Sequence, residues 1–186
     1  VAGAGPAGIA VALAAARAGA RVILADEQAE MGGSLLALAP EASTAIGGRP
    51  AAAWRDAALA ELAAMPNVRL LARSTVFGYH DYNYLTICER LHDHLPVAQR
   101  SGRRERIWRV RAKQVVLATG AQERPLVFGN NDRPGIMLAS AASAYAHRYG
   151  VRLGSRAVVF TNNDAGYRTA LDLSRSGVAV AAVVDS

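Results

Sequence analysis

The chain has 186 residues, of which 52% are hydrophobic and 19% charged, so it is long and apolar enough for one or two domains with a substantial core. Its net charge of +6 comes from scattered arginines and a single lysine, unlike the basic face with interleaved aromatic residues that binds nucleic acid. The single cysteine, Cys88, excludes an internal disulfide and a redox-active cysteine pair, and no apolar run reaches the length of a membrane span. We therefore expect a cytoplasmic protein that binds neither nucleic acid nor membrane.

The first eight residues contain a Gly-x-Gly-x-x-Gly motif, whose turn leads into a predicted helix over 6–18. Gly3 allows a tight turn out of a strand, Gly5 lets the backbone approach a pyrophosphate, and Gly8 lets the helix pack closely against the strand. The free N–H groups at the start of the helix would hold the phosphates.

Two acids, Asp26 and Glu27, follow a predicted buried strand over 21–25 and stand about 20 residues after the turn. An acid there accepts hydrogen bonds from ribose hydroxyls and repels the 2′-phosphate of NADP. The pattern predicts a β-α-β dinucleotide unit for NAD or FAD, because both contain an ADP half. The next turn, Gly32-Gly33-Ser34, either approaches a phosphate or is a plain surface turn.

The middle of the chain predicts a second helix and an antiparallel meander. Residues 35–48 are small and irregular. The predicted elements are a helix over 50–65, a strand over 68–71, a meander of strands over 75–79, 84–88 and 106–111, and a buried parallel strand over 114–120.

The last third repeats the first. Residues 121–134 are a predicted connector, and further elements follow over 135–149 (helix), 156–160 (strand), 165–176 (helix) and 178–184 (strand). In this copy Thr161 and Asn163 replace the first two glycines, and only Gly166 remains. A side chain at position 163 would crowd a pyrophosphate and Asp164 would repel it, so we expect the copy to have lost its nucleotide.

The fold class that follows is α/β. We expect a Rossmann-like FAD/NAD(P)-binding fold with a parallel sheet, an antiparallel β-meander and the start of a second dinucleotide-binding-like domain. The predicted first domain is 1–132, which lacks its C-terminal return, and the degenerate second begins over 133–186. Both ends of the chain fall at strand edges, so we expect a piece of a larger subunit.

Other candidate sites are weaker. His92 and His94 would share one side of a strand, but no third ligand is in view and no metal site is predicted. The basic segment 100–106 is a solvated loop or a contact for an acidic partner or a flavin phosphate. No nucleophile with a matching base can be argued, so no catalytic residue is named.

Several segments resemble a known family. The glycine turn, Asp26-Glu27-Gln28 with Gly32-Gly33-Ser34, and Ala118-Thr119-Gly120-Ala121 resemble flavoprotein reductases with two dinucleotide-binding domains. The longer segments 75–86, 118–128 and 130–137 more specifically resemble the α subunits of heterotetrameric sarcosine oxidases.

This resemblance implies a function for the complete enzyme. Sarcosine, tetrahydrofolate and O2 would give glycine, 5,10-methylenetetrahydrofolate and H2O2. It implies FAD in the β subunit, FMN at the α–β interface, γ and δ subunits as further partners, and NAD+ without an evident redox role in this chain. The folate-binding domain would lie outside these residues.

The resemblance also implies the contacts with NAD+. The acids would hold the adenosine ribose, with Gln28 near the adenine edge, Ser34 facing the phosphates and Val76 against adenine. The full set is Gly3, Gly5, Ala7, Gly8, Asp26, Glu27, Gln28, Gly33, Ser34, Val76, Thr119 and Gly120. Two alternatives stay open: an FAD-binding subunit of an amino-acid or opine dehydrogenase, and a non-enzymatic assembly module.

Overall fold

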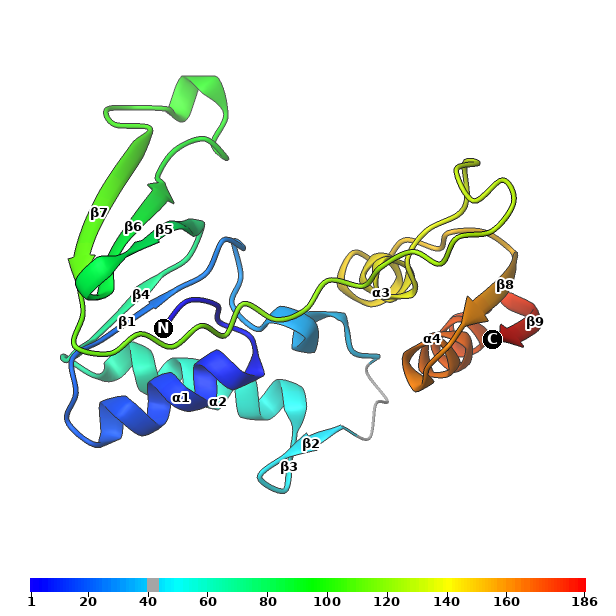
Figure 1. The fold of residues 1–186 in the computed structure, drawn as a ribbon, viewed down its shortest axis with the longest axis horizontal. Helices are drawn as coiled ribbons and strands as arrows, with labels where there is room; N and C mark the ends of the chain where they lie inside the picture. Colours follow the sequence, from blue (N-terminus) through cyan, green and yellow to red (C-terminus); the bar gives the residue numbers. More distant parts are fainter. Residues whose placement is uncertain (40–43) are drawn as a thin grey trace. The chain divides into compact units, whose positions relative to one another are not determined.

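The computed structural model describes residues 1–39 and 44–186, which form two compact units (Figure 1). Unit 1 comprises Val1–Leu35 and Thr44–Gly120, and unit 2 comprises Ala121–Ser186 with the short segment that follows Leu35. Each unit has a core of its own. Among the described residues, no helix is both long enough and apolar enough to cross a bilayer.

The centre of unit 1 is a short parallel sheet. Strand β1 (Val22–Ala25) pairs in parallel with β4 (Val68–Leu71), in register from Val22 opposite Val68. The opening residues occupy the next position, since Ala2 forms parallel bridges to both Ala25 and Leu117. The start of the chain therefore lies in extended form between β1 and the segment around Leu117, and the predicted β-α-β arrangement is confirmed.

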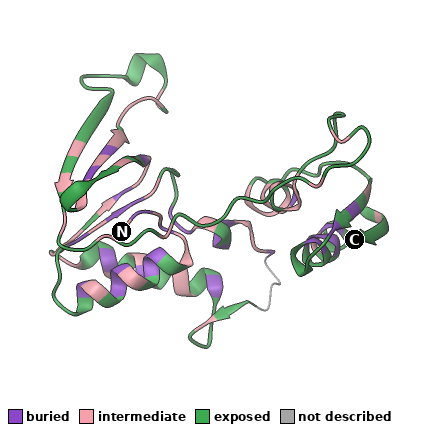
Figure 2. Cartoon of the chain, viewed as in Figure 1, coloured by how far each residue is buried: buried purple, intermediate pink, exposed green. Residues whose placement is uncertain are grey.

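Helices α1 (Pro6–Arg17) and α2 (Ala51–Ala64) pack together in unit 1 (Figure 1). The sequence of α1 is rich in alanine, and its buried residues include Ile9 and Leu13. Figure 2 shows buried positions along this helix in purple. The largest fully buried side chains of this core are Ile9, Leu24 and Leu62. Burying such a side chain contributes roughly 1.5–3 kcal/mol, so this core supports the loop that precedes α1.

Strands β5 (Ser74–His80), β6 (Tyr84–Arg90) and β7 (Glu105–Arg111) form the predicted antiparallel meander. The β5–β6 turn is tight because Tyr82 and Asn83 both have positive φ, +59° and +54°. The inward side chains of the meander pack with the ends of β1 and β4 in one cluster. That cluster contains Ala25, Leu71, Val76, Ile87, Trp108 and Val110.

Two predictions for unit 1 need correction. Residues 114–120 do not form a buried strand: Leu117 makes an isolated bridge to Ala2 and is 58% exposed. The backbone of residues 114–120 forms sheet hydrogen bonds to Ala2 alone, because no strand of the described residues lies on the other side of this segment. The stretch 35–48 is not wholly irregular either, since Ala45–Ile46 (β2) pairs with Arg49–Pro50 (β3); residues 40–43 lie outside the described part.

Unit 2 contains β8 (Arg156–Thr161), α4 (Asp164–Arg175) and β9 (Ala179–Asp185), with β8 and β9 parallel, as predicted. The helix expected over 135–149 begins only at Ala139, as α3 (Ala139–Ser143), and continues as a π-helical turn (Ala144–Arg148, η4). It starts late because Gly135 has φ +94°, while the Glu123 carboxylate accepts a hydrogen bond from Ser140 N at 2.8 Å.

Candidate functional site

All twelve predicted contact residues lie in unit 1, and most of them surround the turn between the opening residues and α1. Two glycines of this turn are required by the packing of the protein, because a side chain at either position would overlap a neighbouring backbone atom. Gly3 has φ +97°, and a Cβ there would overlap the carbonyl of Ala118. A Cβ at Gly8 would overlap the carbonyl oxygen of Gly3. These two glycines set how closely the turn, the helix and the 118 segment pack.

Gly5 differs from the other two glycines. Its φ of −73° and ψ of −176° are accessible to any residue, and a Cβ added there would meet no atom of the described residues within 4 Å, apart from its chain neighbours. Neither backbone strain nor a protein neighbour therefore requires a glycine at this position. The missing side chain leaves open space beside the first turn of α1, where a pyrophosphate needs close backbone approach.

The N-terminus of α1 is suited to an anion. Gly5 is its N-cap residue, and no side-chain hydrogen bond caps this end in the described part of the chain. Pro6 has no N–H, and Ala7 in the first turn is exposed. Uncapped N–H groups and the positive end of the helix dipole together favour a phosphate group.

The two acids after β1 occupy different environments. Asp26 Oδ2 accepts a hydrogen bond from Ala4 N at 2.6 Å, and its Oδ1 accepts one from Gln28 N at 2.8 Å. Glu27 is exposed, and no described residue bonds to its carboxylate. The Asp26 carboxylate thus links the glycine turn to the segment after β1 by hydrogen bonds, while the exposed Glu27 carboxylate is accessible to a ligand.

The Gly32-Gly33 turn lies close to the glycine turn, and its predicted approach to a phosphate stays a prediction. Gly32 N donates to Ala4 O at 2.9 Å. Gly33 has φ +55°, and a Cβ there would lie 2.8 Å from Gly5 Cα. Ser34 follows at once and is exposed. The backbone of this turn therefore forms a second wall beside the open space at Gly5.

The remaining predicted contacts are less closely tied to the loop. A Cβ on Gly3 would lie 3.2 Å from Thr119 N, so the 118–120 segment lines the turn, and Thr119 and Gly120 are both exposed. Val76 packs into the core of the meander. The adenine contacts of Val76 and Gln28 stay predictions.

The structure adds two arginines that no sequence pattern selects. Arg90 Nη2 donates to the carbonyl oxygen of Glu27 at 2.9 Å, and Arg73 N donates to Gln28 O at 2.9 Å. Arg90 is the last residue of β6, and Arg73 directly precedes β5. No local pattern relates them to Glu27, because Arg90 is 63 residues away along the chain.

The corresponding turn in unit 2 is occupied by its own side chains. Asn163 Oδ1 accepts a hydrogen bond from Ala165 N at 2.9 Å and so caps α4. Thr161 Oγ1 donates to Asn163 O at 2.9 Å, and Tyr167 donates to Asp185 Oδ2 at 2.9 Å. The start of α4 and the acid that ends β9 are both engaged in hydrogen bonds, unlike the uncapped α1 and the open Glu27 of unit 1.

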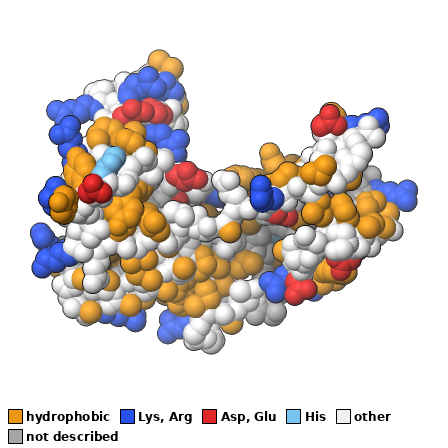
Figure 3. Space-filling view, viewed as in Figure 1, with side chains coloured by type: hydrophobic (Ala, Val, Ile, Leu, Met, Phe, Trp, Pro, Cys, Tyr) orange, Lys and Arg blue, Asp and Glu red, His pale blue; other side chains and the backbone are white. Residues whose placement is uncertain are grey.

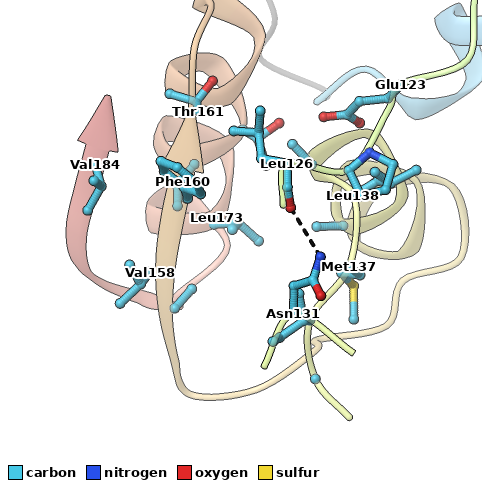
Figure 4. Close-up of a pocket in the computed structure, with 18 of the residues that line it drawn as sticks. Glu123, Leu126, Asn131, Met137, Leu138, Val158, Phe160, Thr161, Leu173 and Val184 are labelled. Atoms are coloured by element: carbon cyan, nitrogen blue, oxygen red, sulfur yellow. Dashed lines mark hydrogen bonds between the residues drawn. The ribbon is translucent and has the colours of Figure 1, made fainter. Parts of the chain in front are cut away.

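Unit 2 also has a cavity of about 1070 Å³ (Figure 4). Its lining is mainly apolar and includes Leu126, Phe128, Met137, Leu138, Phe160 and Leu173. The carboxylate of Glu123 at this cavity is already bonded to the α3 backbone. Among the described residues, no group of three or more His, Cys, Asp or Glu side chains is placed to hold a metal.

The whole chain is similar in sequence to parts of known oxidases. It is 55% identical to the alpha subunit of sarcosine oxidase from Corynebacterium sp. (strain P-1) and 50% identical to that from Rhizobium meliloti (strain 1021), and it spans 19% and 18% of those proteins. An opine oxidase subunit of Agrobacterium tumefaciens (strain Ach5) is 33% identical over the whole chain, which spans 36% of it. The resemblance found in the sequence motifs is thus confirmed over all residues of this chain, which spans under a fifth of the sarcosine oxidase relatives.

The structure of this chain is also similar to part of a solved structure. L-proline dehydrogenase from P. horikoshii superimposes with a TM-score of 0.76 over 98% of this chain and 34% of that one, at 23% identity. This similarity confirms the Rossmann-like α/β fold. Residues 1–183 match the model for pyridine nucleotide-disulphide oxidoreductases, and the chain belongs to that family.

Proposed function

We propose that unit 1 binds the ADP half of NAD+, with the pyrophosphate over Gly5 at the start of α1 and a ribose at Glu27. One observation carries this proposal: Gly5 has neither a conformational nor a packing need for glycine, and it borders an uncapped helix N-terminus. An exposed carboxylate at Glu27 suits ribose hydroxyls and opposes a 2′-phosphate.

The choice of NAD+ over FAD rests on the resemblance to sarcosine oxidase α subunits. Both molecules carry the same ADP half, so Gly5 and Glu27 favour them equally. In this proposal the NAD+ is structural, since no catalytic group among the described residues stands beside the loop and the copy in unit 2 is closed by its own side chains.

For the full-length protein we propose a role in sarcosine oxidation. Sarcosine, tetrahydrofolate and O2 would be converted to glycine, 5,10-methylenetetrahydrofolate and H2O2, with FAD and FMN bound mainly through other parts of the assembly. The relatives are far longer than this chain and are named as subunits. We also propose that the protein is cytoplasmic. A domain boundary between residues 132 and 133 is proposed as well.

Exposed apolar side chains support the presence of β, γ and δ partners. Unit 1 exposes Phe77 (59%), Tyr79 (52%), Tyr82 (85%) and Ile107 (52%), all from the meander. Hydrophobic side chains are visible at the surface of each unit (Figure 3). Exposed aromatic residues of this kind are typical of surfaces that become buried in assemblies.

The test is to denature the purified full-length protein, separated from its partners, and to identify the released nucleotide by chromatography and absorbance. We expect one NAD+ per chain and no flavin from this protein. Release of FAD would reject NAD+ in favour of the second candidate, and release of no nucleotide would favour an assembly module.

That second candidate is an FAD-binding subunit of an opine- or amino-acid-oxidising enzyme. The observation that favours it is the 33% identity with the opine oxidase relative over the whole chain. The isolated protein would then be yellow, and activity assays with opines would distinguish the two.

A further inference from the structure

We propose that the open edge of strand β7 binds an acidic, extended segment of a partner subunit, which adds to the meander as a further strand. The inference rests on the proposed function only for the premise that partner subunits exist. The direction of the backbone groups along the edge and its charge come from this chain alone.

Strand β7 has one side without a neighbouring strand. The order of the meander is β5-β6-β7, so β7 is its edge strand (Figure 1), and no strand of the described residues pairs with its other side. Leu91 N donates to Arg104 O at 2.8 Å, and Ala112 N donates to Asn83 O at 3.0 Å. The even-numbered residues of β7 therefore direct their backbone groups toward β6. Since this direction alternates along a strand, the N–H and C=O groups of the odd-numbered residues point away from β6 and are available to a further strand.

Two cations without an acidic partner lie along the same edge. Arg109 and Arg111 are exposed, and neither guanidinium group bonds to any described residue. By contrast, Arg106 Nη1 lies 3.2 Å from Glu89 Oε2. The two unpaired arginines belong to the outer face of the meander, because the alternate residue Trp108 packs into its inner cluster. Carboxylates at the facing positions of an added strand would form cross-strand ion pairs with them.

The outer face next to this edge has the composition of a contact surface. Ile107 is 52% exposed. Tyr84 lies opposite Arg111 in the register of β6 and β7, and its ring is 5.7 Å from that of His80. Tyrosine and arginine are both enriched where protein surfaces meet. An added strand would therefore contact side chains as well as backbone groups.

The charge of the edge selects its occupant. Cationic side chains on an edge strand oppose pairing with most other strands. A second copy of β7, paired antiparallel about residue 109, would place Arg109 opposite the same arginine of the other copy, and the chain as a whole has a net charge of +6. A strand with carboxylates at alternate positions reverses the sign of this interaction. The same arginines thus reject a second copy and favour an acidic segment.

Amide hydrogen exchange at single residues tests the inference on the full-length protein, alone and assembled with its partner subunits. In the protein alone, the amides of Ile107, Arg109 and Arg111 should exchange rapidly, while those of the alternate residues are protected by β6. In the assembly these three amides should exchange at least about tenfold more slowly. Unchanged exchange at all three overturns the inference.

Substitutions at Arg109 separate the contribution of the backbone from that of the charge. Arg109→Ala removes the charge and keeps the N–H, whereas Arg109→Pro also removes an N–H that points away from β6. Assembly, followed by sedimentation, should be weakened in both and by about tenfold more in Arg109→Pro, the effect of one lost hydrogen bond. Equal dissociation constants for the two variants overturn the strand pairing.

Charge reversal decides the matter if the proline variant does not fold. The double variant Arg109→Glu with Arg111→Glu should weaken assembly at least about tenfold. Arg21→Glu is the matched control, since Arg21 is an exposed arginine directly before β1, and it should assemble like the wild type. An equal loss per reversed charge in the control would show a general effect of net charge and overturn the inference.

A peptide probe distinguishes failure of this inference from failure of the proposed function. A capped heptapeptide of alternating glutamate and valine should slow exchange at Ile107, Arg109 and Arg111 in the full-length protein alone, and the peptide with lysine in place of glutamate should not. Equal exchange with the two peptides overturns the inference. If the protein carries no nucleotide and joins no partner, the proposed function fails, while the peptide result still decides whether the edge of β7 accepts an acidic strand.

Discussion

Gly8 lies so close to the carbonyl oxygen of Gly3 that a methyl group on its Cα would overlap that oxygen. Gly5, between them, would accept the same methyl group with no described residue other than its chain neighbours within 4 Å. One turn therefore contains glycines with two different purposes, and matched alanine substitutions separate them.

Gly5→Ala should leave the fold intact and impair nucleotide binding. Its backbone angles suit alanine, so the free energy of unfolding without nucleotide should change by less than about 1 kcal/mol. The dissociation constant for NAD+ should rise at least about tenfold, which corresponds to about 1.4 kcal/mol. Urea denaturation and calorimetry measure the two quantities, and undiminished affinity would contradict the placement of the pyrophosphate.

Gly8→Ala is the matched control. Here the added methyl group must displace the Gly3 carbonyl, so we expect a loss of about 1–3 kcal/mol in the free energy of unfolding, as for other overpacked sites. A variant as stable as the wild type would show that the turn and the helix are packed less closely than described.

Asn163→Ala should destabilise unit 2 without altering nucleotide content. The substitution removes the side-chain cap of α4, a loss of about 1 kcal/mol for caps of this type. Asn163→Asp keeps an acceptor and should restore most of the stability. Chromatography after denaturation should give one nucleotide per chain in the wild type and in both variants. Two nucleotides per wild-type chain would show that the second turn is not closed.

Cys88 should react slowly with alkylating agents. Burial raises the pKa of its thiol, and the nearby Glu105 carboxylate raises it further. Since the thiolate is the reactive form, a raised pKa lowers the reactive fraction at neutral pH. Mass spectrometry of the Cys88 peptide after iodoacetamide treatment should show slower labelling than in the urea-unfolded protein, with the midpoint of the rate–pH profile moved to higher pH.

Removing the acid provides the control for that experiment. Glu105→Gln should move the midpoint back toward lower pH and accelerate labelling at neutral pH, while the contribution from burial remains. Labelling in the folded wild type as fast as in the unfolded protein would contradict the protected environment of this thiol.

The fold was predictable where hydrophobic periodicity and the positions of the glycines indicate the same bounds for a helix or strand. Helix α1, strand β1 and the meander follow their sequence patterns, and so does the repeated strand-helix-strand of unit 2. The prediction was wrong at residues 135–138, because the backbone at Gly135 is left-handed and Glu123, a distant residue, caps the helix that begins later. It was also wrong for burial at Leu117, since burial depends on what covers a strand and not on its own composition.

The candidate site was predictable in its positions but not in the roles of its residues. Spacing identified Asp26 and Glu27 as the acids after β1, yet only the structure shows that backbone N–H groups occupy the first carboxylate and not the second. The contribution of Arg90 comes from a contact between residues 63 positions apart, for which a single sequence contains no signal.

The inner position of the opening strand has a consequence for how the protein folds. Ala2 bridges Leu117, and the wall against Gly3 is Ala118, near the far end of unit 1. Contacts of such large sequence separation form late, because most of the loop-closure entropy must be overcome first. On the ribosome, the glycine turn therefore stays incomplete until nearly all of unit 1 has emerged from the exit tunnel. Under the proposed function, nucleotide binding would follow this closure and would stabilise chains in which Ala2 has already met Leu117.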